Sequence, residues 1–183
     1  MKILIISILS IFALQSLHAQ KYFTKEGNIS FYSDAPMEKI EATNSKATSV
    51  IDSETGAMQW SVLIKAFHFE KSLMEEHFNE NYMESSKFPK AFFKGKIDNI
   101  DAVDFEKDGV YTTDISGSLE IHGVEQDVTT QGTITVKGGG IKGDCTFTVA
   151  VADYDIEIPA LVADNIAKEV EIHVQADYQK LNK

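Results

Sequence analysis

The chain lacks arginine: each of its 17 basic side chains is a lysine, and 28 acidic side chains stand against them. Without the planar guanidinium fork, a phosphate group would have to be held by lysine, hydroxyl groups or the backbone. The formal net charge of −11 also opposes binding to nucleic acids and to anionic membrane surfaces. We therefore expect no nucleic acid among the partners.

Cysteine and catalytic motifs are equally scarce. Cys145 is the only cysteine, so no internal disulfide can form and stability must come from packing. The sequence has no Gly-x-Ser-x-Gly elbow, no phosphate-cradling glycine loop and no His-Glu-x-x-His pair. None of the histidines after residue 20 shows the tight spacing of metal ligands. We expect no catalytic activity, no metal and no cofactor.

The only long apolar run lies at the N-terminus. It extends from Ile3 to Leu17, follows Met1-Lys2 and precedes Ala19-Gln20, a pattern typical of a signal peptide rather than a membrane span. We assign residues 1–19 to a signal peptide cleaved near Ala19, and residues 20–183 to one periplasmic or secreted domain. No later run approaches the roughly 20 apolar residues of a spanning helix, so stable membrane insertion is not expected.

Most of the remaining chain alternates between apolar and polar residues, which is typical of strands with one buried face. The last such segment sets Val170, Ile172 and Val174 against Glu171 and His173. Eight segments follow this pattern, at about Gly27–Ser33, Ile40–Ile51, Met58–Ala66, Ala91–Ile100, Val110–Ile121, Val128–Lys137, Ile141–Val151 and Val170–Tyr178. Eight antiparallel strands with short turns favour a closed barrel, although a two-sheet sandwich fits the same alternation.

Two segments depart from the alternation. Apolar and aromatic residues recur at helical spacing from Glu70 to Ser85, which predicts an amphipathic helix packed at one end of the barrel. A short helix is predicted over Ile158 to Ala167, where Pro159 suits a first turn.

The histidines admit two interpretations. His77 interrupts the apolar stripe of the predicted helix, as Tyr82 does, and His122 ends a strand just before Gly123. One interpretation places all three side chains at a mouth of the barrel, against the polar head group of a ligand. In the other, the histidines form hydrogen bonds with backbone carbonyl groups and stabilise the fold without contacting a ligand.

Several motifs resemble those of the YceI-like family. Leu119-Glu120-Ile121-His122-Gly123-Val124 is similar to its Leu-x-Ile-His-Gly segment, and Asp153-Tyr154-Asp155-Ile156 to its Asp-Tyr-Gly-Ile element, with Asp155 in the place of the glycine. The region before them also fits, with Met74, His77-Phe78, Tyr82-Met83, Lys87-Phe88-Pro89 and Phe92-Phe93 in the family's order. The resemblance continues to the closing strand at Glu169–Tyr178.

This resemblance implies a mainly β fold, an eight-stranded antiparallel lipocalin-like barrel with a helix at one end. It also implies that the interior holds a polyisoprenoid or another long-chain amphiphile, for carriage or storage. We expect the tail of such a lipid to contact the inward side chains Trp60, Val62, Ile64, Phe78, Phe93, Leu119, Phe147, Val149, Ile172 and Val174.

Two other functions stay open at this point. The rim histidines His77 and His122 would serve a metal-assisted hydrolase of small molecules. A barrel filled by its own side chains would instead be a ligand-free interaction module. A homodimer is compatible with the sequence.

Overall fold

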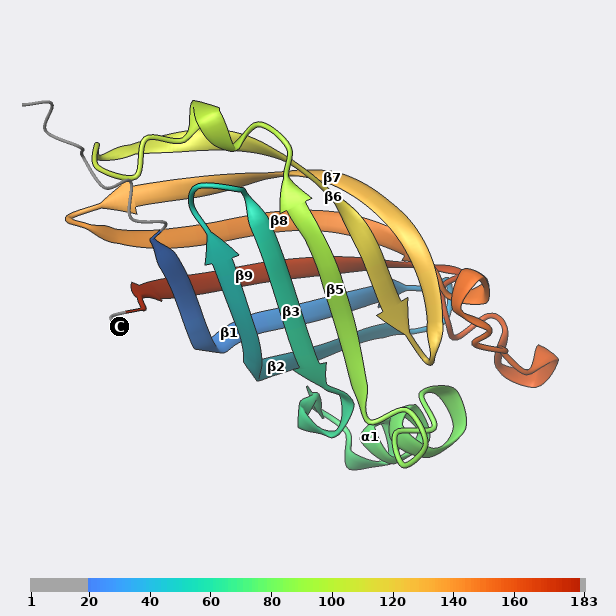
Figure 1. The fold of residues 1–183 in the computed structure, drawn as a ribbon. Coiled ribbons are helices and arrows are strands. Elements are labelled where there is room, and N and C mark those ends of the chain that lie inside the picture. The colour runs from blue at the N-terminus through green and yellow to red at the C-terminus, as the bar shows by residue number, and fades with distance from the viewer. Residues whose placement is uncertain (1–19, 182–183) are drawn as a thin grey trace, which may run out of the picture.

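The computed structural model describes residues 20–181, which form one closed antiparallel barrel (Figure 1). The signal-peptide assignment falls on residues 1–19 and lies outside the described residues. The long strands are β1 (Lys21–Asp34), β2 (Lys39–Asp52), β3 (Ala57–Leu63), β5 (Lys90–Ile97), β6 (Gly109–Ile121), β7 (Val124–Lys137), β8 (Gly140–Ala150) and β9 (Glu169–Lys180).

Around the barrel these strands follow the order β1-β9-β8-β7-β6-β5-β3-β2, and the pairing of β2 with β1 closes the circle. The two-residue strand β4 (His68–Phe69) is an addition to β2, at Ala42 and Thr43. The predicted eight-stranded barrel is therefore confirmed. Closure decides between the two architectures that the alternation had left open, because a sandwich would leave edge strands unpaired.

Two tight turns show why these residues join neighbouring strands. His122 and Gly123, with φ of 54° and 77°, connect β6 to β7, and Gly138 and Gly139, with φ of 57° and 80°, connect β7 to β8. Two-residue hairpin turns with positive φ at both positions match the twist of the flanking strands. Histidine is among the residues that adopt this conformation more readily than most. Asp155, which stands in the place of the glycine in the resembling motif, also has a positive φ, 54°, a conformation that glycine adopts without steric cost.

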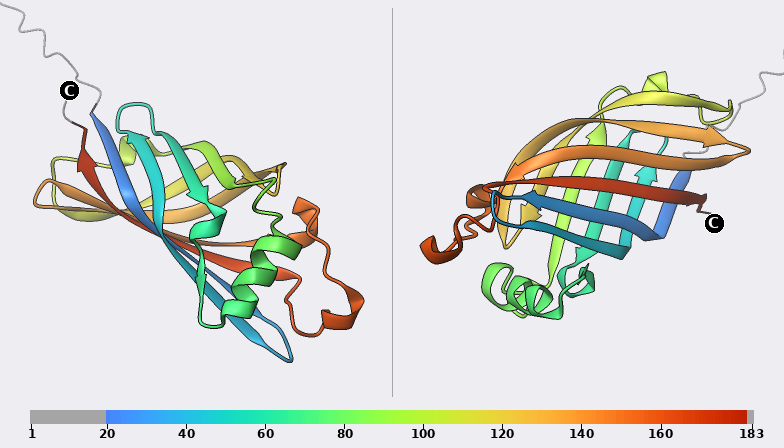
Figure 2. Two further views of the ribbon diagram at one scale, coloured as in Figure 1. Left: turned by 90° about the horizontal axis from the view of Figure 1, so that it is seen from below. Right: turned by 180° about the vertical axis from the view of Figure 1, so that it is seen from behind.

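The segment between β3 and β5 winds over one end of the barrel (Figure 2). It contains the 3-10 turn η1 (Ile64–Ala66), the helix α1 (Ser72–His77) and the π-helical turn η2 (Phe78–Tyr82). The predicted helix at Glu70–Ser85 is thus shorter, and its second half is wound more loosely because Met83 N–H donates to the Phe78 carbonyl, five residues back.

The long connection from β8 to β9 lies at the same end of the barrel (Figure 2). It holds two 3-10 turns, η4 (Val151–Tyr154) and η5 (Ala160–Val162). The helix predicted over Ile158–Ala167 is wrong beyond that single turn. Its small apolar residues have helical propensity but little partner surface, since Leu161 is 95% exposed, and a short helix without packing is not stable. The remaining 3-10 turn, η3 (Ile100–Ala102), follows β5.

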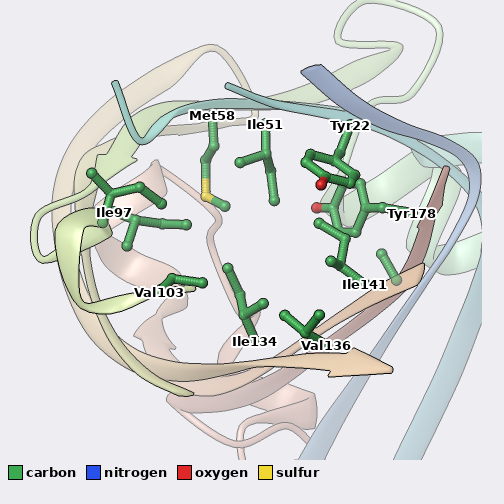
Figure 3. Close-up of a cluster of buried hydrophobic side chains, with 11 residues drawn as sticks. Tyr22, Ile51, Met58, Ile97, Val103, Ile134, Val136, Ile141 and Tyr178 are labelled. Atoms are coloured by element: carbon green, nitrogen blue, oxygen red, sulfur yellow. The ribbon is translucent and has the colours of Figure 1, made fainter. Parts of the chain in front are cut away.

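The two ends of the barrel differ in packing. At the closed end, defined by the cluster around Tyr22, Ile51, Met58, Ile97 and Tyr178, inward side chains from the ends of the strands fill the barrel (Figure 3). At the helical end, defined by α1, η2, η5 and the β1–β2 turn at residues 35–38, helical segments and turns cover the barrel instead. The cavity therefore lies inside the barrel, between the packed side chains of the closed end and the turns and helical segments of the helical end.

Candidate ligand-binding cavity

A cavity of about 400 Å³ occupies the interior of the barrel. Its floor is the closed end, where Ile51, Met58, Ile97 and Tyr178 line it. It continues to the helical end, where Phe69, from β4, and other residues of that end line it. Ligand pockets in proteins commonly have volumes of about 300 to 1,000 Å³. The barrel is therefore not completely filled by its own side chains.

All ten side chains that the sequence places inward line this cavity. Where two of them lie on one strand, they are two residues apart and so point to the same side of the sheet. Ile64 and Phe78 are not on strands: Ile64 lies in the turn η1 and Phe78 at the start of η2. Six of them are only half-buried although they face the interior, namely Trp60, Phe78, Phe93, Phe147, Ile172 and Val174. Contact of these ten residues with a lipid stays a prediction.

Aromatic rings gather where the cavity meets α1. The ring of Phe78 lies 5.5 Å from Phe31, 5.7 Å from Phe67 and 5.0 Å from Phe69, measured between ring centroids. These contacts anchor the helical segment to β1 and β4. Phe31, Phe67 and Phe69 also line the cavity, and sequence reasoning did not single them out. The alternation Phe67-His68-Phe69 was the signal that could have found two of them.

His77 and Tyr82 lie at the helical end and line the cavity. The Nδ1 atom of His77 is 2.8 Å from the Nδ2 atom of Asn81. Burial raises the pKa of the Tyr82 hydroxyl. Both groups therefore sit at a boundary between an apolar interior and solvent, and Tyr82 stays uncharged at neutral pH.

Glu38, in the β1–β2 turn, is a lining residue that sequence reasoning missed. Lys71 donates to its carboxylate at 2.9 Å, and the side-chain amide of Asn165 donates at 3.4 Å. The hydrogen bond from Lys71 and then that from Asn165 lower the pKa of Glu38 below its usual value. This three-residue contact joins the β1–β2 turn to the start of α1 and to the segment that follows η5. No local sequence pattern around residue 38 predicts this contact, because both partners are distant in the sequence.

His122 does not line the cavity. Its Nδ1 atom is 3.2 Å from the carbonyl oxygen of Tyr154, and its Nε2 atom is 2.9 Å from the carboxylate of Glu84. The ring also contacts Phe88, with 4.5 Å between centroids. His122 thus has protein partners on both nitrogens. The contact with the Tyr154 carbonyl agrees with the second interpretation of the histidines, whereas the Glu84 carboxylate is a partner that this interpretation did not include.

These contacts bring together the motifs that carry the family resemblance. His122 belongs to the first, Tyr154 to the second and Phe88 to the third, although they are far apart in the sequence. Gly123 contributes by its small size, since a Cβ atom there would lie 2.5 Å from the Phe88 ring. The motifs therefore form a junction that fixes the helical end, and we call it the His122 junction.

Three deeper polar groups, those of Ser49, Tyr178 and Cys145, are engaged or unreactive. The hydroxyl groups of Ser49 and Tyr178 are 2.9 Å apart at the closed end, and burial raises the pKa of Tyr178 strongly. Burial also raises the pKa of the Cys145 thiol to about 11. Cys145 therefore stays protonated at neutral pH and lines the cavity as a small apolar group.

The described part of the chain has neither a cluster of metal ligands nor a membrane-spanning helix. Within residues 20–181, no three His, Cys, Asp or Glu side chains gather closely enough to hold a metal ion. The helices of the same region are all too short or too polar to cross a bilayer.

Comparison with known proteins identifies both a family model and similar structures. The model of the YceI-like domain matches residues 16–178. A polyisoprenoid-binding domain from Saccharophagus degradans, implicated in plant cell wall breakdown, superposes with a TM-score of 0.76 at 14% identity, over 89% of this chain and 99% of that one. No curated protein sequence matches significantly.

Two other solved structures share the fold. BcnA from Burkholderia cenocepacia has a TM-score of 0.66 at 18% identity, over 82% of this chain and 96% of that one. The YCEI protein of Campylobacter jejuni has a TM-score of 0.54 at 14% identity, over 78% and 85% of the respective chains. At such identities the likeness establishes a common barrel fold and does not identify a ligand.

Proposed function

The chain belongs to the YceI-like family, and from this premise we propose that it is a periplasmic or secreted protein that holds one long-chain amphiphile, of the isoprenoid type, in its barrel. The observation that carries the proposal is the cavity of about 400 Å³, whose lining is mostly aliphatic and aromatic from its floor to the helical end. A narrow apolar cavity closed at its far end fits a flexible hydrocarbon tail better than a compact polar molecule.

The energetics support a tail as the main source of affinity. Each buried CH₂ group contributes about 0.8 kcal/mol, so a tail of several isoprene units provides a gross gain of more than about 10 kcal/mol. Association and ordering of the tail offset about 4 to 15 kcal/mol of this gain. The difference still allows binding at low concentrations once the tail is long enough. Head-group contacts then decide which lipid of a given length binds.

The proposed head-group contacts are His77 and Tyr82, because both line the cavity at the helical end. We leave His122 out of them, because its two nitrogens are engaged in the His122 junction. The same arrangement disfavours a hydrolase that uses both histidines, since only His77 reaches the cavity. The Saccharophagus degradans protein is described as a polyisoprenoid-binding domain, and the shared fold makes that ligand class the natural one to test.

Secretion is part of the proposal and rests on the sequence of residues 1–19. Export and cleavage near Ala19 would give a mature protein that begins at or near Gln20. N-terminal sequencing of the protein recovered from the extracytoplasmic fraction tests this directly. An N-terminus at Met1 in that fraction would refute the signal-peptide assignment.

The function is tested by organic extraction of the protein purified from its own host, followed by mass spectrometry of the extract. We expect one predominant lipid with a long hydrocarbon tail, at about one molecule per protein. The matched control is Val149→Asp, which places a carboxylate in the cavity wall and should be recovered without that lipid. Equal amounts of lipid from both proteins would show that the lipid is not held in the cavity.

A further inference from the structure

The charges around the cavity are distributed unevenly. Among the described residues, the lining contains no lysine, although the whole chain has 17. Two acidic residues, Glu38 and Asp144, are part of it. The carboxylate of Asp144 is engaged by His173 at 3.3 Å and by Gln175 at 2.6 Å, and these two residues alternate with the inward-facing Val174 on β9. Glu38 is therefore the carboxylate that a ligand at the helical end would meet.

Three lysines at the helical end are paired with carboxylates. Lys71 bonds Glu38 at 2.9 Å, Lys39 lies 3.4 Å from Asp34 and Lys87 lies 3.9 Å from Glu84. Of these, Lys71 is the one whose partner lines the cavity. An anionic head group that bound Lys71 would have to compete with Glu38, which would then face the anion with only the Asn165 amide as its partner. The low pKa of Glu38 keeps it charged at neutral pH.

The neutral polar groups at the same end are hydrogen-bond donors. The amide nitrogen of Asn81 donates to Nδ1 of His77, so the proton of the neutral ring lies on Nε2. Nε2 of His77 and the hydroxyl of Tyr82 form no hydrogen bond within residues 20–181. Two donors without a protein partner among the described residues, at the end of the cavity where Glu38 is the charged lining group, suit an uncharged oxygen acceptor, such as a carbonyl or hydroxyl oxygen.

We propose that the cavity selects lipids with an uncharged, oxygen-bearing head group and excludes lipid phosphates, and that Glu38 determines this specificity by holding Lys71 in an ion pair. The inference rests on the proposed lipid-binding function and assigns to it a class of head group. It gives Glu38 a role that neither the family match nor the apolar lining supplies.

The test measures the binding of a prenol and of the prenyl monophosphate with the same tail. We expect the wild type to prefer the prenol by on the order of tenfold, about the size of one charge-assisted contact. In Glu38→Gln, Lys71 is released and the preference should move toward the phosphate by a similar factor. The double variant Glu38→Gln with Lys71→Met should lose that gain, because the released cation is gone.

Glu54→Gln is the matched control. It removes the same charge from the exposed turn between β2 and β3, at the closed end, and should leave the wild-type preference unchanged. The inference is overturned if the wild type binds the phosphate as well as the prenol, a result that needs no variant. It is also overturned if the gain of Glu38→Gln persists without Lys71, or appears equally in Glu54→Gln. If neither lipid binds the wild type saturably, it is the proposed function that fails.

Discussion

Val149 gives the sharpest test of which side of β8 faces the cavity. Its side chain is buried against Leu119 and Tyr154 and lines the cavity, whereas the neighbouring Thr148 is exposed. Val149→Asp removes an apolar side chain whose burial contributes about 1.5 to 3 kcal/mol. The new carboxylate must either stay hydrated inside the cavity or take up a proton. We expect loss of lipid binding together with a lower free energy of unfolding.

The pH dependence of this variant has a defined sign. Burial raises the pKa of the new carboxyl in the folded state above its unfolded value of about 3.9. The folded state then binds more protons than the unfolded state, so stability relative to wild type falls as the pH rises from the unfolded to the folded pKa. Each unit by which the folded pKa is raised adds about 1.4 kcal/mol to the destabilisation at neutral pH. Urea unfolding at about pH 5 and about pH 8 measures this loss of stability, because an upward shift of about 3 to 4 units places the folded pKa between these two pH values.

Thr148→Asp is the control on the same strand. Its carboxylate points to solvent opposite Glu171 on β9, so it should cost no more than about 1 kcal/mol and leave lipid binding intact. If Val149→Asp binds lipid normally, or if both variants lose binding equally, then the inward assignment of β8 is wrong.

Three further predictions concern polar groups around the cavity. Tyr178→Phe leaves the buried hydroxyl of Ser49 without its partner and should lower the free energy of unfolding by about 1 to 3 kcal/mol in urea titrations; an unchanged midpoint would contradict this. His122→Asn keeps a residue that tolerates positive φ but removes the contacts with Glu84 and Phe88. It should lower the free energy of unfolding by about 1 to 3 kcal/mol without changing the preference between head groups. A changed preference would show that His122 belongs to the binding site. Cys145 should react with a thiol reagent far more slowly at pH 8 than an unfolded control does, because burial raises its pKa to about 11, and equal rates would show that it is not buried.

The barrel strands were predictable because most of them have one solvent-exposed face, which gives the sequence its alternation of apolar and polar residues. Where alternation is strict, as around Val149 and Ile172, parity alone assigns the inward side chains. The eight strands follow from such local signals. Closure of the barrel does not, because it depends on the pairing of β1 with β9, which lie at opposite ends of the chain and which no local pattern joins.

The helical end was less predictable because distant segments build it. Glu38 acquires its partners from residues 33 and 127 positions away, and His122 from residues 38 and 32 positions away. Sequence periodicity indicated that His77 and His122 are polar groups near apolar surfaces, but only the fold separates the one that lines the cavity from the one in the junction. Residues 158–167 were misassigned because helical propensity was not matched by a packing surface.

The central claim is that the barrel interior holds a hydrocarbon tail, and the fluorescence of Trp60 tests it most directly. Trp60 is the only tryptophan of the chain and lines the cavity, so its emission reports whether the interior is occupied. Delipidated protein is titrated with a series of prenols of increasing chain length. We predict a saturable change at one lipid per protein, with affinity rising by up to about 0.8 kcal/mol for each added CH₂ until the tail fills the cavity. A response that does not saturate, or an affinity independent of chain length, would contradict the claim.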